Sequence, residues 1–270
     1  MNCFRLPLVA MILAAALSGC AGTANAPRQE PQPSLEQKPT LQQPVVADAR
    51  ERAKVHTDLG IAYLRDRNYE VALNEVQIAI EMHDGYAPAH NLKGLIHMAL
   101  GQNEQADAGF RQAVALAPNN PEFSNNFGWF LCQTGKVKES FAYFNQVLRN
   151  PLYKTPQTVL HNMGVCALLD KDDVSGESYL FRSLKLDANN LRAYYLLADI
   201  GYRNRRYDDA REWMKQLHAK MEPTAETAWL ALRIDRKLSD REGEARYTGI
   251  LRRKYRDTPE YQQMLRGEFD

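Results

Sequence analysis

The cysteine residues offer the most position-dependent chemistry in this chain. Four occur among 270 residues, and they are Cys3, Cys20, Cys132 and Cys166. This number is far too small for a fold held together by disulfides. A single thiol can still be acylated, oxidised to a disulfide or bound to a metal, and its surroundings decide which of these happens.

Cys20 ends a stretch that has the pattern of an export signal. Arg5 is the only charged residue before it, and the apolar run at residues 6–17 is too short to span a bilayer as a stable helix. The stretch ends in the letters LSGC, which resemble the bacterial lipobox, where small residues precede a cysteine whose sulfur receives a diacylglyceryl group. We therefore expect cleavage after Gly19 and lipidation of Cys20. The alternative is an ordinary signal peptide that is cleaved elsewhere.

Removal of the signal changes the charge and the compartment of the chain. Loss of residues 1–19 removes one positive charge, so the 34 Lys and Arg become 33, against 33 Asp and Glu. A neutral chain argues against charge-driven binding of nucleic acid. Several acyl chains on Cys20 would anchor it stably. Ala21 and Gly22 follow Cys20, and Asp, the usual inner-membrane retention residue, is absent. The lipobox resemblance therefore implies a lipid anchor at the periplasmic face of the outer membrane, an oxidising location.

No catalytic motif is present in the sequence. It lacks GxSxG, HExxH, GxxxxGK[ST], GxGxxG and CxxC. His83, His90 and His97 are spaced by seven residues, but no acidic residue or cysteine stands at ligand spacing from them. This favours packing roles for the histidines, with a metal site as the alternative. We therefore expect a protein that is not an enzyme and has no catalytic residue, metal, cofactor or small-molecule substrate.

Two basic clusters have no assigned role. One includes Arg203, Arg205 and Arg206, and the other includes residues 252–254 and Arg256. Nearby acidic residues favour solvated faces. Contacts to a partner or to lipid headgroups are the alternative.

The elements that carry these residues begin after a tether. Residues 20–47 start with the lipidated cysteine and continue with five Pro and five Gln among residues 21–47, which predicts a disordered linker. Small residues then recur in pairs separated by 12 residues, mostly with a period of 34. The pairs are Gly60 with Ala72, Gly94 with Ala106, Gly128 with Ser140, Gly164 with Gly176, Ala198 with Ala210, and a degraded pair, Arg233 with Ala245.

A period of 34 residues is typical of the tetratricopeptide repeat (TPR), which is a pair of antiparallel helices. We expect residues 48–270 to form an all-α, right-handed superhelical solenoid of about six such pairs. The repeats are expected at about 53–86, 87–120, 121–154, 157–190, 191–224 and 226–259. Small residues would lie where the first helix of a pair (helix A) crosses the second (helix B).

The repeat register places Cys132 and Cys166 on neighbouring A helices. The spacing of packed helices, about 8–10 Å, makes a disulfide between them tight, because bonded cysteines need Cα atoms within about 7 Å. An oxidising compartment favours the bond. Two buried free cysteines are the alternative.

The same register predicts a groove along the A helices of repeats one to four. Apolar residues recur on this face beside polar ones, which suits docking of a peptide or helix. The predicted groove residues are Ile61, Leu64, Asn91, Leu95, Met98, Asn125, Trp129, His161 and Val165. Packing inside the superhelix or beneath the tail is the alternative for these residues.

The combination of lipobox, Pro/Gln tether and six repeats resembles the type IV pilus biogenesis and stability lipoproteins, the PilF/PilW-type pilotins. The stretch NNFGWFL at residues 125–131 and PEYQ at residues 259–262 add to the likeness. The resemblance implies a TPR scaffold in the outer membrane that helps the pilus secretin to reach that membrane and to multimerise. The alternative is a TPR lipoprotein of the outer-membrane β-barrel assembly machinery, whose usual five repeats and shorter linker fit less well.

Overall fold

The computed structural model describes residues 48–269, which form thirteen α-helices and no β-strand. The expected signal peptide, the lipidation site at Cys20 and the tether lie outside the described residues. Within the described part, no helix is long and apolar enough to cross a membrane. The helices are α1 (Ala49–Arg65), α2 (Tyr69–Met82), α3 (Ala87–Ala99), α4 (Asn103–Leu116), α5 (Pro121–Gln133), α6 (Val137–Leu148), α7 (Pro156–Leu169), α8 (Asp173–Leu186), α9 (Leu191–Arg203), α10 (Tyr207–His218), α11 (Ala225–Lys237), α12 (Arg241–Lys254) and α13 (Pro259–Arg266).

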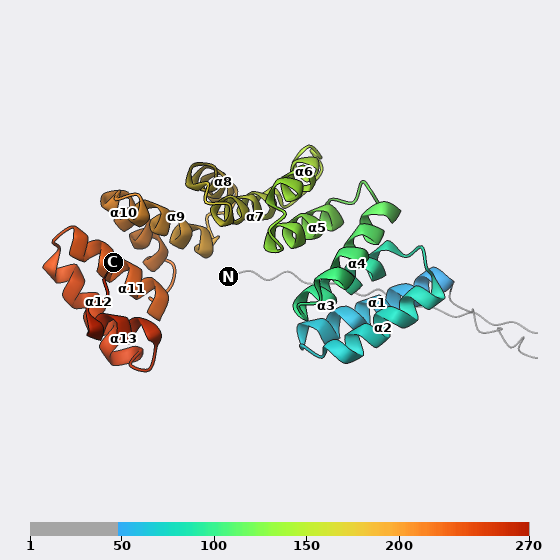
Figure 1. Cartoon of the computed structure of the whole chain (residues 1–270), viewed down its shortest axis with the longest axis horizontal. Coiled ribbons are helices and arrows are strands. Elements are labelled where there is room, and N and C mark those ends of the chain that lie inside the picture. Colours follow the sequence, from blue (N-terminus) through green and yellow to red (C-terminus); the bar gives the residue numbers. More distant parts are fainter. Residues whose placement is uncertain (1–47, 270) are drawn as a thin grey trace, which may run out of the picture. The chain divides into compact units, whose positions relative to one another are not determined.

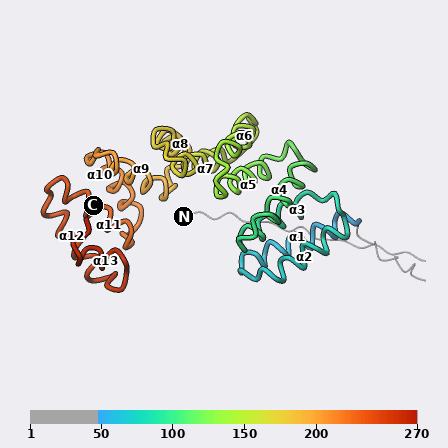
Figure 2. The backbone as a smooth tube through the Cα atoms, in the orientation of Figure 1, coloured from blue at the N-terminus to red at the C-terminus, as the bar shows by residue number. Residues whose placement is uncertain are grey.

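The helices pack as six consecutive pairs followed by α13 (Figure 1). Each odd-numbered helix from α1 to α11 is helix A of a pair, and the next helix is its helix B. Every helix B also contacts the A helix that follows it, so the pairs stack in chain order, as the backbone trace shows (Figure 2). This confirms the all-α solenoid of helix pairs that the 34-residue period predicts.

Glycines at the crossing of the two helices allow close packing. A Cβ atom on Gly94 of α3 would lie 2.8 Å from the Phe110 ring of α4, and one on Gly128 of α5 would lie 2.8 Å from the Phe144 ring of α6. Both rings are fully buried. The small residue in helix A therefore makes room for a large core residue in helix B.

The turn inside each pair uses one residue in the left-handed backbone region. These residues are Arg67, Gly101, Gly135, Lys171, Arg205 and Ser239, with φ between 58° and 81°. Their spacing is 34, 34, 36, 34 and 34 residues, so the turn geometry follows the repeat even though only two of the six are glycine. The longer interval contains the extended connection between α6 and α7, as the sequence predicts.

In the sixth repeat, the small-residue pair expected from the sequence, Arg233 with Ala245, is wrong. Ala245, the expected small residue of helix B, is exposed, whereas Gly243 is buried against Asp235 of α11. Leu232 is buried at the place of Ala198 in the preceding repeat, and Arg233 is only half-buried. Leu232 and the turn residue Ser239 each lie 34 residues after their counterparts, Ala198 and Arg205, so the sixth repeat keeps the 34-residue period and starts one residue earlier than expected. The helix B position of that period is Glu244, which directly follows Gly243. The small-residue pattern of this repeat was misleading because a large Leu occupies the helix A position.

Candidate partner-binding surface

The apolar residues of the predicted groove all lie on the A helices of the first four repeats. Each is half-buried, and the set comprises Ile61 and Leu64 on α1, Leu95 and Met98 on α3, Trp129 on α5, and Val165 on α7. We call these six residues the apolar stripe. The A helices that carry the stripe are in contact, α1 with α3, α3 with α5, and α5 with α7.

Most of the stripe side chains also contribute to packing between repeats. Leu95 and Met98 pack against the aromatic core cluster that contains Phe127 and Phe130. Trp129 packs against the next cluster, which contains Phe144. The core thus fixes these side chains from one side, while the remainder of each stays accessible to a partner.

The two asparagines of the predicted groove take part in hydrogen bonds between repeats. Asn91 Oδ1 accepts a hydrogen bond from Asn126 Nδ2 at 3.2 Å, and Asn125 Oδ1 accepts one from Asn162 Nδ2 at 3.1 Å. Asn91 and Asn125 are only 5% and 8% exposed. Their carbonyl oxygens therefore stabilise the stacking of repeats two to four, which leaves the amide Nδ2 groups for a partner.

We call these two hydrogen bonds between repeats the asparagine ladder. Its donors, Asn126 and Asn162, were not among the residues predicted for the groove. They are 36 residues apart, the same spacing as Gly128 and Gly164. That shared spacing was the signal that could have identified them as equivalent.

His161 occupies the position in repeat four that Asn91 and Asn125 occupy in repeats two and three. It is uncharged at neutral pH. Burial in α7 lowers its pKa below the ordinary value, and the positive charge of Arg192 acts in the same direction. Its Nδ1 is 3.1 Å from the Asn190 amide nitrogen, which also donates to the Ser183 hydroxyl. His161 therefore contributes a neutral polar edge to this surface.

A disulfide joins Cys132 of α5 to Cys166 of α7, with the Cα atoms 5.7 Å apart. Both residues are buried. The bond links the A helices of repeats three and four, which carry Trp129 and Val165 of the apolar stripe. The two A helices therefore approach closely enough at these cysteines for the disulfide that the sequence analysis considered.

The stripe does not continue into the last two repeats. The positions equivalent to Trp129 and Val165 are held by Asp199 on α9 and Arg233 on α11. The neighbouring Ile234 is fully buried. The Arg233 guanidinium lies over the rings of Tyr202 and Trp229, with its carbon 4.7 Å and 5.5 Å from the ring centres.

Phe269, near the end of the chain, also packs on this part of the A-helix face. Its ring lies 5.4 Å from Trp229, and its carbonyl oxygen accepts a hydrogen bond from the Tyr202 hydroxyl at 2.9 Å. The apolar stripe on the A-helix face is therefore confined to repeats one to four.

The other histidines make local contacts. His56 Nδ1 is 2.6 Å from Glu75, His90 Nε2 is 2.7 Å from the carbonyl oxygen of Asp84, and His97 Nδ1 is 2.6 Å from Gln102. Across residues 48–269, no group of three or more His, Cys, Asp or Glu is placed to hold a metal ion.

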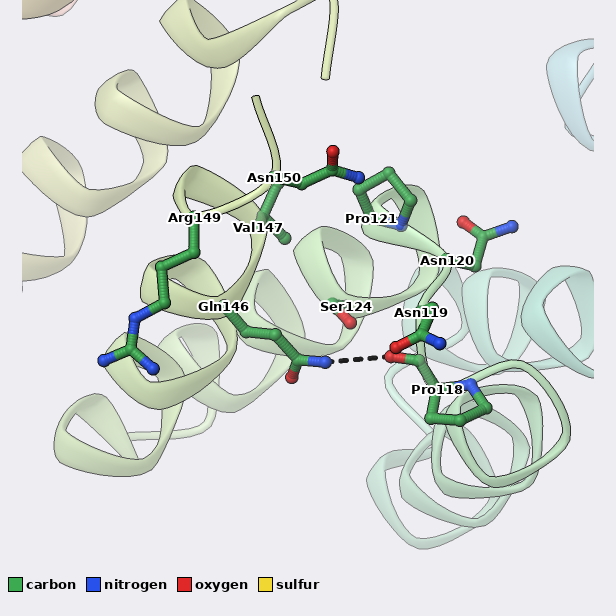
Figure 3. A pocket seen from close by; sticks show the side chains of 9 residues that line it. All are labelled: Pro118, Asn119, Asn120, Pro121, Ser124, Gln146, Val147, Arg149 and Asn150. Atoms are coloured by element: carbon green, nitrogen blue, oxygen red, sulfur yellow. Dashed lines mark hydrogen bonds between the residues drawn. The ribbon is translucent and has the colours of Figure 1, made fainter. Parts of the chain in front are cut away.

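A cavity of about 300 Å³ at the joint of repeats two and three was not foreseen from the sequence (Figure 3). It lies between the connection from α4 to α5 and the end of α6. Gln146 bridges its two sides by donating a hydrogen bond to the carbonyl oxygen of Pro118 at 2.8 Å. The lining is Pro118, Asn119, Asn120, Pro121, Ser124, Gln146, Val147, Arg149 and Asn150.

The family of the chain follows from its repeats. A family model described as tetratricopeptide repeat matches residues 57–121, 91–151 and 177–221, together more than half of the chain. The chain belongs to the tetratricopeptide repeat family. The six TPR helix pairs and the A-helix surface described above therefore correspond to the architecture of this family.

Similar proteins narrow the relationship within the TPR family. The type IV pilus assembly protein PilF of Pseudomonas aeruginosa is 27% identical over 224 residues, which cover 82% of this chain and 89% of PilF. The crystal structure of PilW, a type IV pilus biogenesis factor, matches with a TM-score of 0.74 and 28% identity over 79% of this chain and 98% of that one. The Pseudomonas aeruginosa PilF structure matches with a TM-score of 0.72 and 26% identity, and covers 81% of this chain and 99% of PilF. The TPR chain is homologous to PilF.

Proposed function

We propose that this TPR protein is an outer-membrane lipoprotein of type IV pilus biogenesis that acts as a pilotin. In this role it binds the pilus secretin and assists its delivery to the outer membrane and its multimerisation. The observation that carries the proposal is the similarity to PilF and PilW along nearly their whole lengths. The matches cover 98% of the PilW chain and 99% of the PilF chain whose structures are solved.

The N-terminal sequence supports the membrane part of the proposal. The LSGC motif provides a lipidation site at Cys20, and the Pro- and Gln-rich residues that follow would hold the TPR array away from the bilayer. Metabolic labelling with a radioactive fatty acid tests this step. Label is expected in the wild-type chain and not in Cys20→Ala, and label in both would contradict lipidation at this residue.

The apolar stripe supports the binding part of the proposal. It presents half-buried Leu, Met, Trp, Ile and Val side chains along four stacked A helices, beside the free amide groups of Asn91 and Asn125. A secretin segment with regularly spaced apolar side chains would fill the stripe, and its carbonyl oxygens would accept from the amides.

Deletion of the gene tests the proposed function as a whole. The expected result is loss of secretin multimers and of surface pili, with normal amounts of other outer-membrane proteins. A broad loss of porins would instead favour a role in β-barrel assembly. Complementation with the wild-type gene controls for effects on neighbouring genes.

A further inference from the structure

A hollow of about 540 Å³ lies between the C-terminal end of α10 and the last turns of α12, away from the apolar stripe. Its lining includes Arg253 and Lys254, which belong to one of the two basic clusters that the proposed function leaves without a role. The lining residues are His218, Ala219, Lys220, Met221, Glu222, Pro223, Ile250, Arg253 and Lys254.

Two cations in this hollow have no carboxylate partner within the described part of the chain. They are Lys220, which follows α10, and Arg253 in the last turn of α12. The third cation, Lys254, is paired with Glu222 at 2.5 Å. Glu222 is the one carboxylate in the lining, so the site carries an excess of positive charge and has spare hydrogen-bond donors.

The hollow is held open by packing that does not involve these cations. The Tyr255 hydroxyl donates a hydrogen bond to the carbonyl oxygen of Pro223 at 2.7 Å, which fixes the connection between α10 and α11 against α12. The His218 ring is anchored by its Nδ1 to the Tyr247 hydroxyl at 2.9 Å. Burial lowers the pKa of His218 to about 4, so at neutral pH the positive charge comes from the lysines and the arginine.

The wall beside the cations is apolar. Met221, Pro223 and Ile250 are half-buried and line the same hollow as Lys220 and Arg253. A ligand that suits both parts has an anionic group next to a hydrocarbon portion. A free inorganic anion would use the cations and leave this apolar wall exposed to water.

We propose that this hollow, the basic hollow, binds the phosphate group of an anionic phospholipid, with Lys220 and Arg253 on the phosphate and Met221 and Ile250 against the adjoining glycerol and upper acyl chain. The basic hollow would give the TPR array a second contact with a membrane surface, separate from the lipid anchor. Cations near an anionic bilayer each strengthen binding by roughly fivefold, so two or three give a weak, reversible and salt-sensitive contact.

The test uses the mature chain with Cys20→Ser, which retains the tether and all repeats but cannot carry an acyl anchor. Co-sedimentation is measured with vesicles of pure phosphatidylcholine and with vesicles containing phosphatidylglycerol. Binding is expected only to the anionic vesicles, and it should weaken as salt increases. Equal binding to both vesicles, or binding to neither, would overturn the proposal.

Point variants in this background locate the contact. Lys220→Ala and Arg253→Ala should each weaken binding to the anionic vesicles by about fivefold. Lys138→Ala is the matched control, because it removes the same charge from an exposed site on α6 and should leave binding unchanged. Glu222→Gln should strengthen binding, since it removes the competing carboxylate and frees Lys254.

Two results would contradict the assignment of the basic hollow even if the chain binds vesicles. One is an equal loss of binding in Lys138→Ala and Arg253→Ala, which would indicate a diffuse charge effect. The other is protection of Arg253 from chemical modification by inorganic phosphate, without vesicle binding, which would assign the basic hollow to a soluble phosphate. Each readout is independent of secretin, so a failure here is distinguishable from a failure of the proposed function.

Discussion

Cys132 of α5 and Cys166 of α7 are joined across the joint of repeats three and four, and the chain between them contains α6 and most of α7. The disulfide thus closes a loop with a sequence separation of 34 residues. It connects two helices that both carry residues of the apolar stripe, Trp129 and Val165. The relative position of these side chains is consequently fixed by a covalent bond in addition to packing.

Reduction of this disulfide is expected to destabilise the array. A closed loop of this length stabilises the folded state by about 3–4 kcal/mol in the chain-entropy description. The midpoint of denaturant unfolding should therefore fall when a reductant is added. The double variant Cys132→Ala/Cys166→Ala should start from the lower midpoint and show no response to reductant. An equal midpoint for the wild-type chain with and without reductant would contradict a stabilising bond.

The crossing glycines should be intolerant of a methyl group where a ring covers them. Gly128→Ala places a Cβ atom 2.8 Å from the Phe144 ring, so we expect the free energy of unfolding to drop by about 1–3 kcal/mol. Gly249→Ala in α12 is the matched control, because its nearest neighbour is the flexible end of Arg253 at 3.1 Å. That variant should be neutral or gain up to about 1 kcal/mol from helix propensity. Similar denaturation midpoints for both variants would argue against the crossing geometry.

The left-handed turn residues predict a stabilising substitution. Lys171 has a φ of 63° in an exposed turn, a conformation that costs a residue with a side chain about 1 kcal/mol or more. Lys171→Gly should therefore raise the free energy of unfolding by about 0.5–1 kcal/mol. Gly135→Ala, at the equivalent turn with a φ of 81°, should lower it. Thermal denaturation of both variants checks the sign, and a destabilised Lys171→Gly would count against this turn geometry.

Asp235 predicts a pH dependence at the sixth repeat. Its side chain is 3% exposed, its Oδ2 has no hydrogen-bond partner, and burial, followed by the nearby Asp240, raises its pKa to about 6. The folded state therefore holds a proton that the unfolded state releases between about pH 4 and 6, so the contribution of this group to stability falls as the pH rises through that range. Asp235→Asn should remove this loss and be more stable than the wild type above pH 6 by about 1–3 kcal/mol.

His218 makes stability change with pH in the opposite direction to Asp235. The effect of Asp235 is therefore measured as the difference in unfolding free energy between Asp235→Asn and the wild type. Burial lowers the pKa of His218 to about 4. The unfolded state, in which the pKa has its ordinary value of 6.5, therefore binds the proton first as the pH falls, and the contribution of His218 to stability decreases from about pH 6.5 to pH 4. The two slopes offset each other in the wild-type chain. Urea unfolding at several pH values should show the Asp235→Asn advantage growing from pH 4 to 6. A constant difference across this range would contradict the raised pKa.

The repeat period predicted most of the fold because it reflects a local requirement that recurs in every pair. Gly94 and Gly128 must be small for a ring to pack on them, so their spacing reports the helix pairs directly. The sixth repeat was placed incorrectly because Leu232 and Glu244 occupy the two positions where the other repeats have small residues. Sequence spacing alone then selected Ala245, which the structure places in solvent.

The candidate binding surface was predictable in position and less so in detail. The apolar stripe follows from the helix register, which assigns each residue to a face. The partners of Asn91 and Asn125 depend instead on how far one repeat is displaced along the next, a quantity that no periodicity encodes. The contact of Phe269 with Trp229 is likewise tertiary, since it joins the chain end to a helix that begins more than 40 residues earlier.

The apolar stripe is the proposed binding site for the pilus secretin, and a direct pull-down with purified secretin tests this binding. Trp129→Ala removes the stripe's largest side chain. Phe181→Ala on α8 is the matched control, because it also removes an aromatic ring, and Phe181 lies outside the stripe and is 41% exposed. The wild-type chain and Phe181→Ala should retain the secretin equally, and Trp129→Ala should retain at least tenfold less, corresponding to a loss of about 1.4 kcal/mol or more. Equal retention by all three folded proteins, or no retention by the wild-type chain, would contradict the account.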